Sequence, residues 1–512
     1  MGFEQVIKAL RNGLPSSNLY FEGEREYETL NGSYLSAMES DLRPAAIFRP
    51  ESRKQVAKFV KIMKPFALGE HGEEATVRFA IRSGGQQPLP GVANIQGGIT
   101  LDLGLLSSVE LQKNGKQTIV SVGAGARWGA VYDKLDGTGL GVTGVRSASG
   151  GVGGLSLTGG VSFFSSREGF VCDNVLNYEV VLASGEIVNA NEHENSDLWI
   201  SLRGGGNNFG VVTRFDFRTF KQPGKFWGGS VFYFLSSWPY HVGALLSELR
   251  KKDAADPNTH VQLSIGYSSQ FSQFACQSQL SYTGADANEN MPEVLKPWAD
   301  RHPQIEQLNS VRLMTLKEAV SEQPAETKGK VRYVIMQWQS FTKDQDTNSS
   351  VRCAYMNVTV KADAPTLFEA TEIFTNSLES VKACSGLMSS LTFQPYSVNT
   401  LQQTARHGGN SLGLNPSDGP LINIMVSTYW NKKSDDAAIL KYMSNATSYM
   451  RREAQRRNKL VSFVSMNHAW AHQDVIECYG EENKRALQET SIKYDPEGLF
   501  QRGVPGGFKL FN

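Results

Sequence analysis

The chain has 512 residues, more than one compact hydrophobic core accommodates, so we expect at least two domains. Its 51 Lys and Arg residues balance 51 Asp and Glu residues, which excludes the overall charge that draws a protein to nucleic acid or to an anionic membrane. A hydrophobic content of 40% with 10% aromatic residues excludes an extended disordered chain.

Three features of the sequence bear on the compartment. Residues 1–13 lack the apolar run of a signal peptide, and no stretch approaches the length of a membrane span, so we expect a soluble protein and favour an intracellular one. The 5 cysteines are scattered, and their spacing predicts neither a disulfide framework nor a zinc site. Glycosylation sequons begin at Asn31, Asn348, Asn357 and Asn445, a number that chance alone would produce, so they leave the compartment open.

The elements of the first 220 residues are short. A helix is predicted at 52–64, where Ser52 suits the N-cap position and apolar residues repeat at helical spacing from Val56 to Met63. Glycine turns then separate short predicted strands at 76–83, 97–103, 116–124, 177–184 and 208–220, with a further helix at 126–137.

The texture changes after Pro223 and Gly224, which we take as the domain boundary. Longer strands are predicted at 259–269, 331–342 and 420–430, and helices at 367–382 and 435–457. Their broad apolar alternation is typical of an antiparallel sheet with one face covered by helices.

Glycine is concentrated in three loops, at 82–91, 144–160 and 203–213. Glycine lets the backbone approach a ligand closely and present its amide N–H groups to an anion. Three such loops at strand ends would suit a long, flat, anionic ligand, although each loop taken alone is equally a turn in a strand-rich domain.

Two common nucleotide-binding fingerprints are absent from the sequence. It contains no GxxxxGK[ST] motif, which argues against a Walker-type NTPase. The segment at 122–135, VGAGARWGAVYDKL, follows a strand and opens a helix, but its glycines depart from the dinucleotide-binding spacing.

The order of the motifs is more specific than any one of them. In chain order the motifs are FAIRSGG, GITLDL, VSVGAGARWGAVYDKL, GGVGGLSLTGG, DLWISLRGGGNNFGVVTRF and the terminal YDPEGLFQRGVPGGFKL. This order resembles the vanillyl-alcohol oxidase / p-cresol methylhydroxylase family of FAD-linked oxidoreductases, and within it the berberine-bridge-like oxidases of fungal secondary metabolism.

The resemblance implies an α+β fold. Its parts would be a two-part FAD-binding domain at 1–223 with its core at 42–222, a substrate domain of antiparallel sheet covered by helices at 224–465, and a C-terminal segment at 466–512 that returns to the FAD domain.

The resemblance also implies a set of FAD contacts. The loop from Arg82 to Gln87 would wrap the pyrophosphate with its backbone amides, and Asn467 would contact the flavin ring. The residues implied in the first loop are Arg82, Ser83, Gly84, Gly85, Gln86 and Gln87. Those under the pyrophosphate and flavin are Ser147, Ser149, Gly150, Gly151, Val152, Gly153, Gly154 and Gly160, and those by the adenine and ribose are Gly206, Asn208, Gly210 and Val211.

Gln86 departs from the family pattern. Many relatives carry a histidine there that is bonded covalently to the flavin, and some add a cysteine in the loop that matches 139–150, where this chain has none. A glutamine amide is not nucleophilic enough for such a bond, so the sequence predicts non-covalent FAD and a flavin that is a weaker oxidant. The alternative is that Gln86 only donates a hydrogen bond to the flavin edge and nothing else changes.

The candidate catalytic residues are His468, Tyr396 and Tyr429. His468 stands where many relatives have a tyrosine, and an imidazole there could act as a base near neutral pH, or it could be a packed histidine. The two tyrosines are predicted on strands that face the flavin, as acid–base groups or as aromatic lining. His468 and His472 are four residues apart, but the segment reads as a strand running into a loop, which argues against a metal site.

These features predict an FAD-dependent oxidoreductase that oxidises a small-molecule secondary metabolite by hydride transfer to the flavin. Dioxygen is the expected reoxidant, with Val152 small enough to leave room for it, and the expected assembly is a monomer or homodimer. The alternatives are a carbohydrate oxidase, a cyclase or isomerase that retains flavin without net redox chemistry, and a binding protein that has lost its cofactor. The substrate and the catalytic base stay open at this point.

Overall fold

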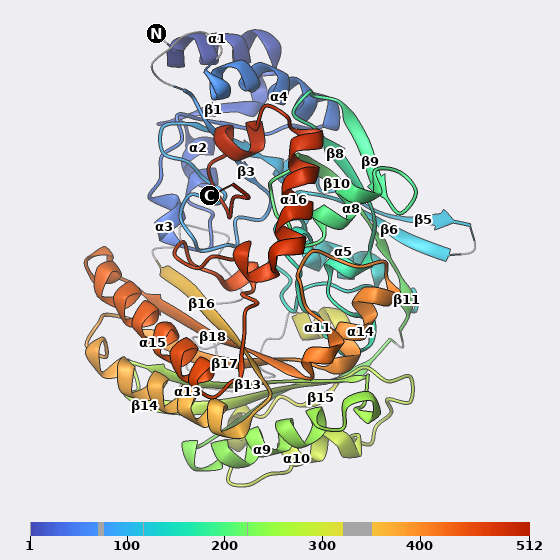
Figure 1. Cartoon of the computed structure of the whole chain (residues 1–512), viewed down its shortest axis with the longest axis vertical. Coiled ribbons are helices and arrows are strands. Elements are labelled where there is room, and N and C mark those ends of the chain that lie inside the picture. Colours follow the sequence, from blue (N-terminus) through green and yellow to red (C-terminus); the bar gives the residue numbers. More distant parts are fainter. Residues whose placement is uncertain (1, 70–75, 116, 223, 321–350, 512) are drawn as a thin grey trace.

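The computed structural model describes residues 2–69, 76–115, 117–222, 224–320 and 351–511. Figure 1 shows the N-terminal strands and helices in the upper half of the molecule and a large sheet with its covering helices in the lower half. Two of the predicted features, Pro223 and the strand at 331–342, lie outside the described residues.

The first predicted helix is confirmed as α4, Arg53–Leu68. Its N-cap is Ser52, whose side chain accepts a hydrogen bond from the backbone N–H of Gln55. The apolar face of the helix is buried, and Phe59 stacks on Phe48 of the neighbouring sheet with ring centroids 5.6 Å apart. The helix is thus held by its buried face rather than by propensity alone.

This neighbouring sheet has four strands in the order β1-β2-β4-β3. Its strands are β1 Leu19–Phe21, β2 Ala46–Phe48, β4 Ile99–Asp102 and β3 Phe79–Arg82. Strands β2, β4 and β3 are parallel, so the glycine loop at 82–91 leaves the sheet at the carboxyl end of β3.

A second, antiparallel sheet has five strands in the order β5-β6-β10-β8-β9. Its strands are β5 Val109–Asn114, β6 Gln117–Gly123, β10 Val211–Arg218, β8 Val175–Val181 and β9 Ile187–Asn191. The other two glycine loops flank it, because 144–160 lies between β6 and β8 and 203–213 leads into β10. A two-stranded ribbon pairs β7 Leu140–Gly141 with β11 Phe220–Lys221.

Short helices connect these strands. They are α1 Gly2–Gly13, α2 Arg25–Asn31, α3 Ala37–Ser40, α5 Trp128–Leu135, α6 Val152–Leu157, α7 Ser165–Glu168 and α8 Ser196–Leu202.

Among the described residues, the lower sheet has eight antiparallel strands in the order β15-β12-β14-β13-β17-β18-β16-β19. They are β15 Arg312–Met314, β12 Phe226–Tyr233, β14 Gln273–Tyr282, β13 Thr259–Ser268, β17 Met388–Tyr396, β18 Leu421–Trp430, β16 Arg352–Lys361 and β19 Leu460–Val461.

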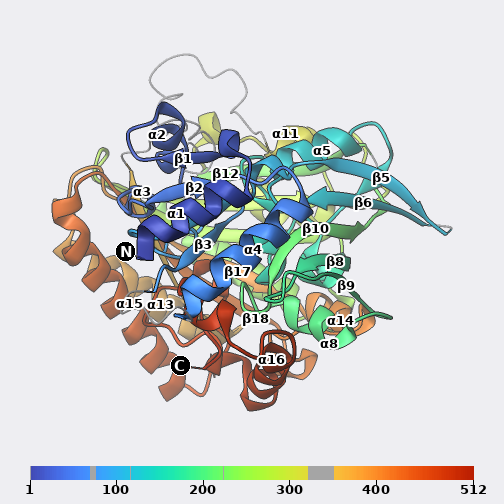
Figure 2. The same cartoon turned by 90° about the horizontal axis from the view of Figure 1, so that it is seen from above.

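Helices cover one face of this sheet. They include α13 Ala364–Ser377 and α15 Asp436–Arg456, which lie side by side in Figures 1 and 2, and α9 Trp238–Leu249 with α10 Lys296–Ala299. The strand residues beneath them, such as Leu263, Ile265 and Val426, form one hydrophobic core with the helices. The alternate strand residues, such as Gln262, Ser264 and Ser427, point to the opposite face, toward the glycine loops.

In the described ranges, three further α-helices are α11 Leu316–Val320, α14 Val398–Arg406 and α16 Glu481–Tyr494. The C-terminal segment packs on the upper half of the molecule, where α16 lies beside α8 in Figure 1. Leu487, Leu499 and Phe500 belong to the same hydrophobic core as α4. The predicted α+β fold, with an antiparallel sheet covered by helices, is confirmed.

Candidate functional site

The three glycine-rich loops meet around one cavity of about 530 Å³, which lies between the two halves of the molecule. Its volume is in the range of small-molecule and cofactor sites. The predicted cofactor residues in its lining are Ser83, Gly84, Gly85, Gln86, Gln87, Ser147, Gly150, Gly151, Gly153, Gly154, Gly206, Gly210, Val211 and Asn467.

The first loop presents unused backbone donors to this cavity. Within the described part of the chain, the N–H groups of Gly84, Gly85, Gln86 and Gln87 donate to no protein acceptor. Buried backbone N–H groups are nearly always paired, so four successive unpaired ones form a natural cradle for an anion. The Arg127 guanidinium adds positive charge nearby, with Nη1 3.0 Å from the place a Cβ of Gly84 would take. These donors fit the diphosphate of FAD.

The structure places another group of predicted cofactor residues behind the lining: Arg82, Ser149, Val152, Gly160 and Asn208. Arg82 is buried, and its guanidinium donates to the carbonyls of Leu30 and Ser33, so it braces the loop from the protein side.

Asn208 also has a supporting position. Its amide donates to the carbonyls of Gly205 and Phe508 and thereby ties the third glycine loop to the C-terminal segment. Gly160 is similarly enclosed, since a Cβ there would meet Leu155 and Val171 about 3 Å away.

Val152 does not face the cavity. It is fully buried in the hydrophobic core of the upper half, whereas its neighbours Gly151, Gly153 and Gly154 line the cavity. Because Val152 begins helix α6, successive residues point in different directions and this one turns inward. The expected space for dioxygen beside Val152 therefore has no counterpart in the lining.

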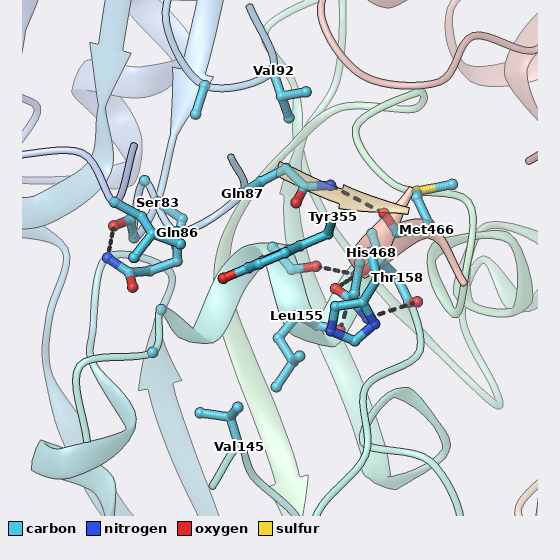
Figure 3. Close-up of a pocket in the computed structure, with 18 of the residues that line it drawn as sticks. Ser83, Gln86, Gln87, Val92, Val145, Leu155, Thr158, Tyr355, Met466 and His468 are labelled. Atoms are coloured by element: carbon cyan, nitrogen blue, oxygen red, sulfur yellow. Dashed lines mark hydrogen bonds between the residues drawn. The ribbon is translucent and has the colours of Figure 1, made fainter. Parts of the chain in front are cut away.

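Gln86 and Gln87 belong to the first glycine loop, and both line the cavity (Figure 3). Gln86 Nε2 donates to the carbonyl oxygen of Gly84 at 3.4 Å. Gln87 Nε2 donates to the carbonyl oxygen of Met466 at 3.1 Å, which links this loop to the segment that carries His468.

Asn467 and His468 lie on a 3₁₀ turn, Met466–His468, and not on the strand that the sequence predicts there. The only strand of this segment is the two-residue β19, which ends before the turn. Asn467 Nδ2 donates to the carbonyl of Thr158, so the turn is also fixed to the end of α6.

His468 lines the cavity and is held in its neutral form. Burial, together with the nearby Arg146 guanidinium, lowers the pKa of His468 to about 4. Its Nδ1 is buried and has no hydrogen-bond partner among the described residues. An unsatisfied buried polar atom costs about 1–3 kcal/mol, a cost that a bound ligand with a hydrogen-bonding group would offset.

Arg146 stands behind the cavity wall with neutral partners. Its guanidinium donates to Oε1 of Gln394 at 2.8 Å and lies 3.4 Å from Nε2 of His260. It forms no ion pair with a described carboxylate, and burial lowers the pKa of Arg146 to about 10. An uncompensated cation at this place opposes protonation of His468.

Of the two predicted tyrosines, only Tyr429 reaches the cavity. Its hydroxyl shares a hydrogen bond of 2.7 Å with the hydroxyl of Tyr355 on strand β16. Tyr355 projects into the cavity in Figure 3, and its ring lies 5.8 Å from the imidazole of His468. Tyr396 instead packs against Phe170 and is buried away from the lining.

The sheet face that closes the cavity is polar and uncharged. Hydroxyl pairs cross from strand to strand, with Ser264 Oγ 2.9 Å from Thr392 Oγ1 and Ser390 Oγ 2.7 Å from Ser427 Oγ. Among the described residues that line the cavity, none is Asp, Glu, Lys or Arg. Other lining side chains of this face are Gln262, Gln277, Tyr267, Met388 and Met425.

Tyr355, Thr158 and the hydroxyl-bearing sheet face also line the cavity, and they were not predicted from the sequence because no motif marks these residues. The strand alternation around Tyr355 does distinguish two faces, since Ala354 and Met356 are apolar, but the pattern alone cannot tell which face meets a cavity.

Three further observations complete the site. No cluster of three or more His, Cys, Asp or Glu suited to a metal occurs in the described ranges. All five cysteines are described and none is in a disulfide. Across the same ranges, the helices are too short or too polar to cross a membrane.

Comparison with known proteins gives the same cofactor. A family model described as an FAD binding domain matches residues 44–191. The FAD-dependent monooxygenase tpcD of Cochliobolus heterostrophus is 32% identical over 95% of this chain and 90% of its own length. The FAD-dependent monooxygenase CTB5 of Cercospora beticola is 31% identical over 98% of this chain and 91% of its own length.

Solved structures share the fold at lower identity. The BBE-like 1 protein of Physcomitrella patens has a TM-score of 0.76 at 18% identity and covers 99% of both chains. The xylooligosaccharide oxidase of Myceliophthora thermophila has a TM-score of 0.74 at 21% identity and covers 98% of this chain and 99% of that chain. The chain therefore belongs to the same family of FAD-dependent oxidoreductases as these fungal relatives, and it has the fold of the berberine-bridge-like oxidases of the vanillyl-alcohol oxidase / p-cresol methylhydroxylase group.

Proposed function

We propose that the protein is an FAD-dependent oxidase of fungal-type secondary metabolism that acts on an uncharged small molecule, holds FAD non-covalently and uses dioxygen as the reoxidant. The observation that carries this proposal is the single cavity in which the unpaired amides of the first glycine loop, His468 and the hydroxyl-bearing sheet face meet.

The FAD would be held by the glycine loops. The amides from Gly84 to Gln87 would donate to its diphosphate, and Gly150 to Gly154 leave the wall free of side chains over most of their length. Bound FAD would supply the hydride acceptor for substrate oxidation.

Gln86 supports non-covalent binding. Its side chain lines the cavity where relatives with covalent flavin carry a histidine, and an amide nitrogen does not form that bond. Acid precipitation of the purified protein should therefore release the yellow cofactor into the supernatant.

The substrate would lie against the sheet. Paired hydroxyls such as Ser264 with Thr392 can each donate or accept, so they suit hydroxyl and carbonyl oxygens alike. A lining without Asp, Glu, Lys or Arg offers no partner to a charged substrate, and burying an unpaired charge is costly.

His468 would accept the proton that leaves the substrate hydroxyl or amine. It is neutral above about pH 4 and its ring faces the same cavity as the Tyr355–Tyr429 pair. The pair would orient the reacting group, since each hydroxyl already fixes the other. Burial raises the pKa of both phenols, so they stay protonated and serve as donors.

The test is anaerobic reduction of the purified holoprotein. Its substrate would be the metabolite that accumulates when the gene is deleted from the source organism. We expect this metabolite to bleach the flavin absorbance, and air to restore it with one hydrogen peroxide formed per product. Product formation without bleaching would point instead to a flavin-retaining cyclase or isomerase. Incorporation of an oxygen atom from dioxygen, with consumption of a nicotinamide, would point to a monooxygenase, the activity in the names of its fungal relatives.

A further inference from the structure

Asn357 is a fully buried amide on strand β16, two residues beyond Tyr355. Its side chain reaches across to the segment that carries His468. Nδ2 donates to the carbonyl oxygens of Ser465 and His468, each at 3.0 Å. Oδ1 accepts from the backbone N–H of Ser465 at 2.9 Å and from Nδ2 of Asn423 at 2.7 Å.

The hydrogen-bonding capacity of this side chain is fully used. An Asn amide has two donor hydrogens and two acceptor lone pairs, and all four are matched here. Three of the four bonds go to the backbone of the segment 465–468, and they hold both of its ends. These three hydrogen bonds to one short turn fix the orientation of residues 465–468.

Gln473 completes the clamp from the other side. Its Nε2 donates to the carbonyl of Asn357 at 2.8 Å, while its Oε1 accepts from the N–H groups of Asn357 and Trp470. The strand and the turn are therefore joined through side-chain amides where ordinary strand pairing has already ended, since β19 stops at Val461.

N-glycosylation does not account for the asparagine at position 357. Asn357 begins a glycosylation sequon, but its side chain is wholly inaccessible and both amide hydrogens are bonded. Asn31, which begins another sequon, is likewise buried, whereas Asn445 is exposed on α15.

We propose that Asn357 is a positioning residue that fixes the 465–468 turn so that His468 faces the cavity beside Tyr355. The inference rests on the proposed role of His468 as the proton acceptor. It adds that the orientation of His468 comes from the substrate sheet rather than from the FAD loops alone.

The direct test is Asn357→Ser in the holoprotein, an uncharged change whose shorter side chain cannot span both carbonyls. Hydrogen–deuterium exchange of the 465–470 amides should become roughly tenfold faster, in line with the loss of about one net hydrogen bond. Exchange in β10, Val211–Arg218, should not change. The matched control is Asn174→Ser, because Asn174 is equally buried and also donates to two backbone carbonyls, those of Glu168 and Phe170.

A second readout follows His468 itself. In the wild type we expect its imidazole, followed by NMR, to titrate near pH 4, with Arg146 from the loop before α6 and Tyr355 from β16 as the groups that face it. In Asn357→Ser the freed ring should gain water and its pKa should rise by about one unit. His468→Gln identifies the signal. A role confined to fold stability would not move this titration.

Asn423→Ser keeps the proposal testable if Asn357→Ser does not fold. It leaves Asn357 in place but removes the bond that orients its amide, so exchange at 465–470 should rise by a smaller factor, roughly threefold. Wild-type exchange and a wild-type His468 titration in a folded Asn357→Ser or, failing that, in Asn423→Ser would overturn the proposal. Neither readout needs turnover, so a failed flavin-bleaching test alone would remove the proposed function and leave the positioning role standing.

Discussion

Gly84 and Gly151 meet backbone to backbone at the point where the first two glycine loops touch. A Cβ built on Gly84 would lie 2.5 Å from the Cα of Gly151, closer than such atoms approach in folded proteins. Gly154 differs, because a Cβ there would meet no protein atom within 4 Å although the residue lines the same cavity. Some glycines of this stretch thus allow the loops to pack together, and Gly154 leaves space for a ligand.

Gly154→Ala should separate these two roles. The change adds no clash to the protein, and alanine favours the helix α6 by about 0.5–1 kcal/mol, so the apoprotein should melt at the same or a higher temperature. FAD affinity should fall roughly tenfold or more, because the methyl group takes ligand space. Titration of apoprotein with FAD, followed by flavin fluorescence, measures the second effect.

Gly243→Ala is the matched control for this experiment. Gly243 lies on α9, a Cβ there also meets nothing within 4 Å, and it is exposed far along the chain from the loops. It should stabilise the protein to a similar degree without changing FAD affinity. Equal FAD affinity in Gly154→Ala and wild type would contradict the assignment of this space to the cofactor.

Gln86→His should give the cavity wall the ring nitrogen that it lacks. We expect part of the flavin to remain with the protein after acid precipitation, whereas Gln86→Asn, which keeps an amide, should release all of it like the wild type. Denaturing gel fluorescence of the washed pellet measures the bound flavin. Complete release from Gln86→His would mean that more than this one residue has been lost from the linkage machinery.

Tyr355→Phe and Tyr429→Phe should have similar effects, because each removes one partner of the 2.7 Å hydroxyl pair. The rate of anaerobic flavin reduction by substrate should fall by about 10²-fold in either variant, a size common for the loss of one acid–base or orienting group. The double variant should be little worse than the single ones, since residues that act as a unit are not additive.

Tyr282→Phe is the control for the tyrosine pair. Tyr282 lies on β14 of the same sheet, but its hydroxyl donates to Asp286 and it does not line the cavity. Its rate of flavin reduction should match the wild type. Additive losses in the double variant of Tyr355 and Tyr429 would show that the two hydroxyls act separately.

The sequence was sufficient for the fold and for the loops of the site. Helical periodicity and the N-cap Ser52 predicted α4 correctly. The three glycine loops line one cavity, in line with the prediction that they share a ligand, because glycine allows the backbone to come close to another backbone or to a ligand. Local sequence patterns did not predict which way each side chain of a helix points. Val152 sits among lining glycines, yet the turn of α6 points it into the core.

The sequence also did not predict which end of a strand lies at the cavity. Tyr396 lies eight positions after Met388 on β17, so the two side chains point to the same face, but only Met388 lines the cavity. Tyr396 pairs with Leu421 and Met388 with Tyr429, at opposite ends of β18, which are roughly 26 Å apart at the usual rise per residue. Which end meets the glycine loops depends on how the two halves of the molecule dock, and no local pattern encodes that.

The pH dependence of substrate oxidation should report the charge state of His468. Burial, reinforced by the Arg146 cation, lowers the pKa of His468 to about 4, so the imidazole is in its accepting form above that pH. The value of kcat/KM should therefore rise through about pH 4 and then level off, and His468→Gln should lower the plateau and abolish this limb.

Arg146→Gln tests the electrostatic part of this argument. Removing a nearby cation favours the imidazolium, so the pKa of His468 should rise toward its ordinary value of 6.5 and the ascending limb should move to higher pH. Gln394 and His260, the neutral partners of Arg146, can both hydrogen-bond to a glutamine, which limits structural damage. Values of kcat/KM measured from about pH 3.5 to about pH 8 for the wild type and the variant give both profiles. A limb that stays near pH 4 in Arg146→Gln would mean that burial alone keeps His468 neutral.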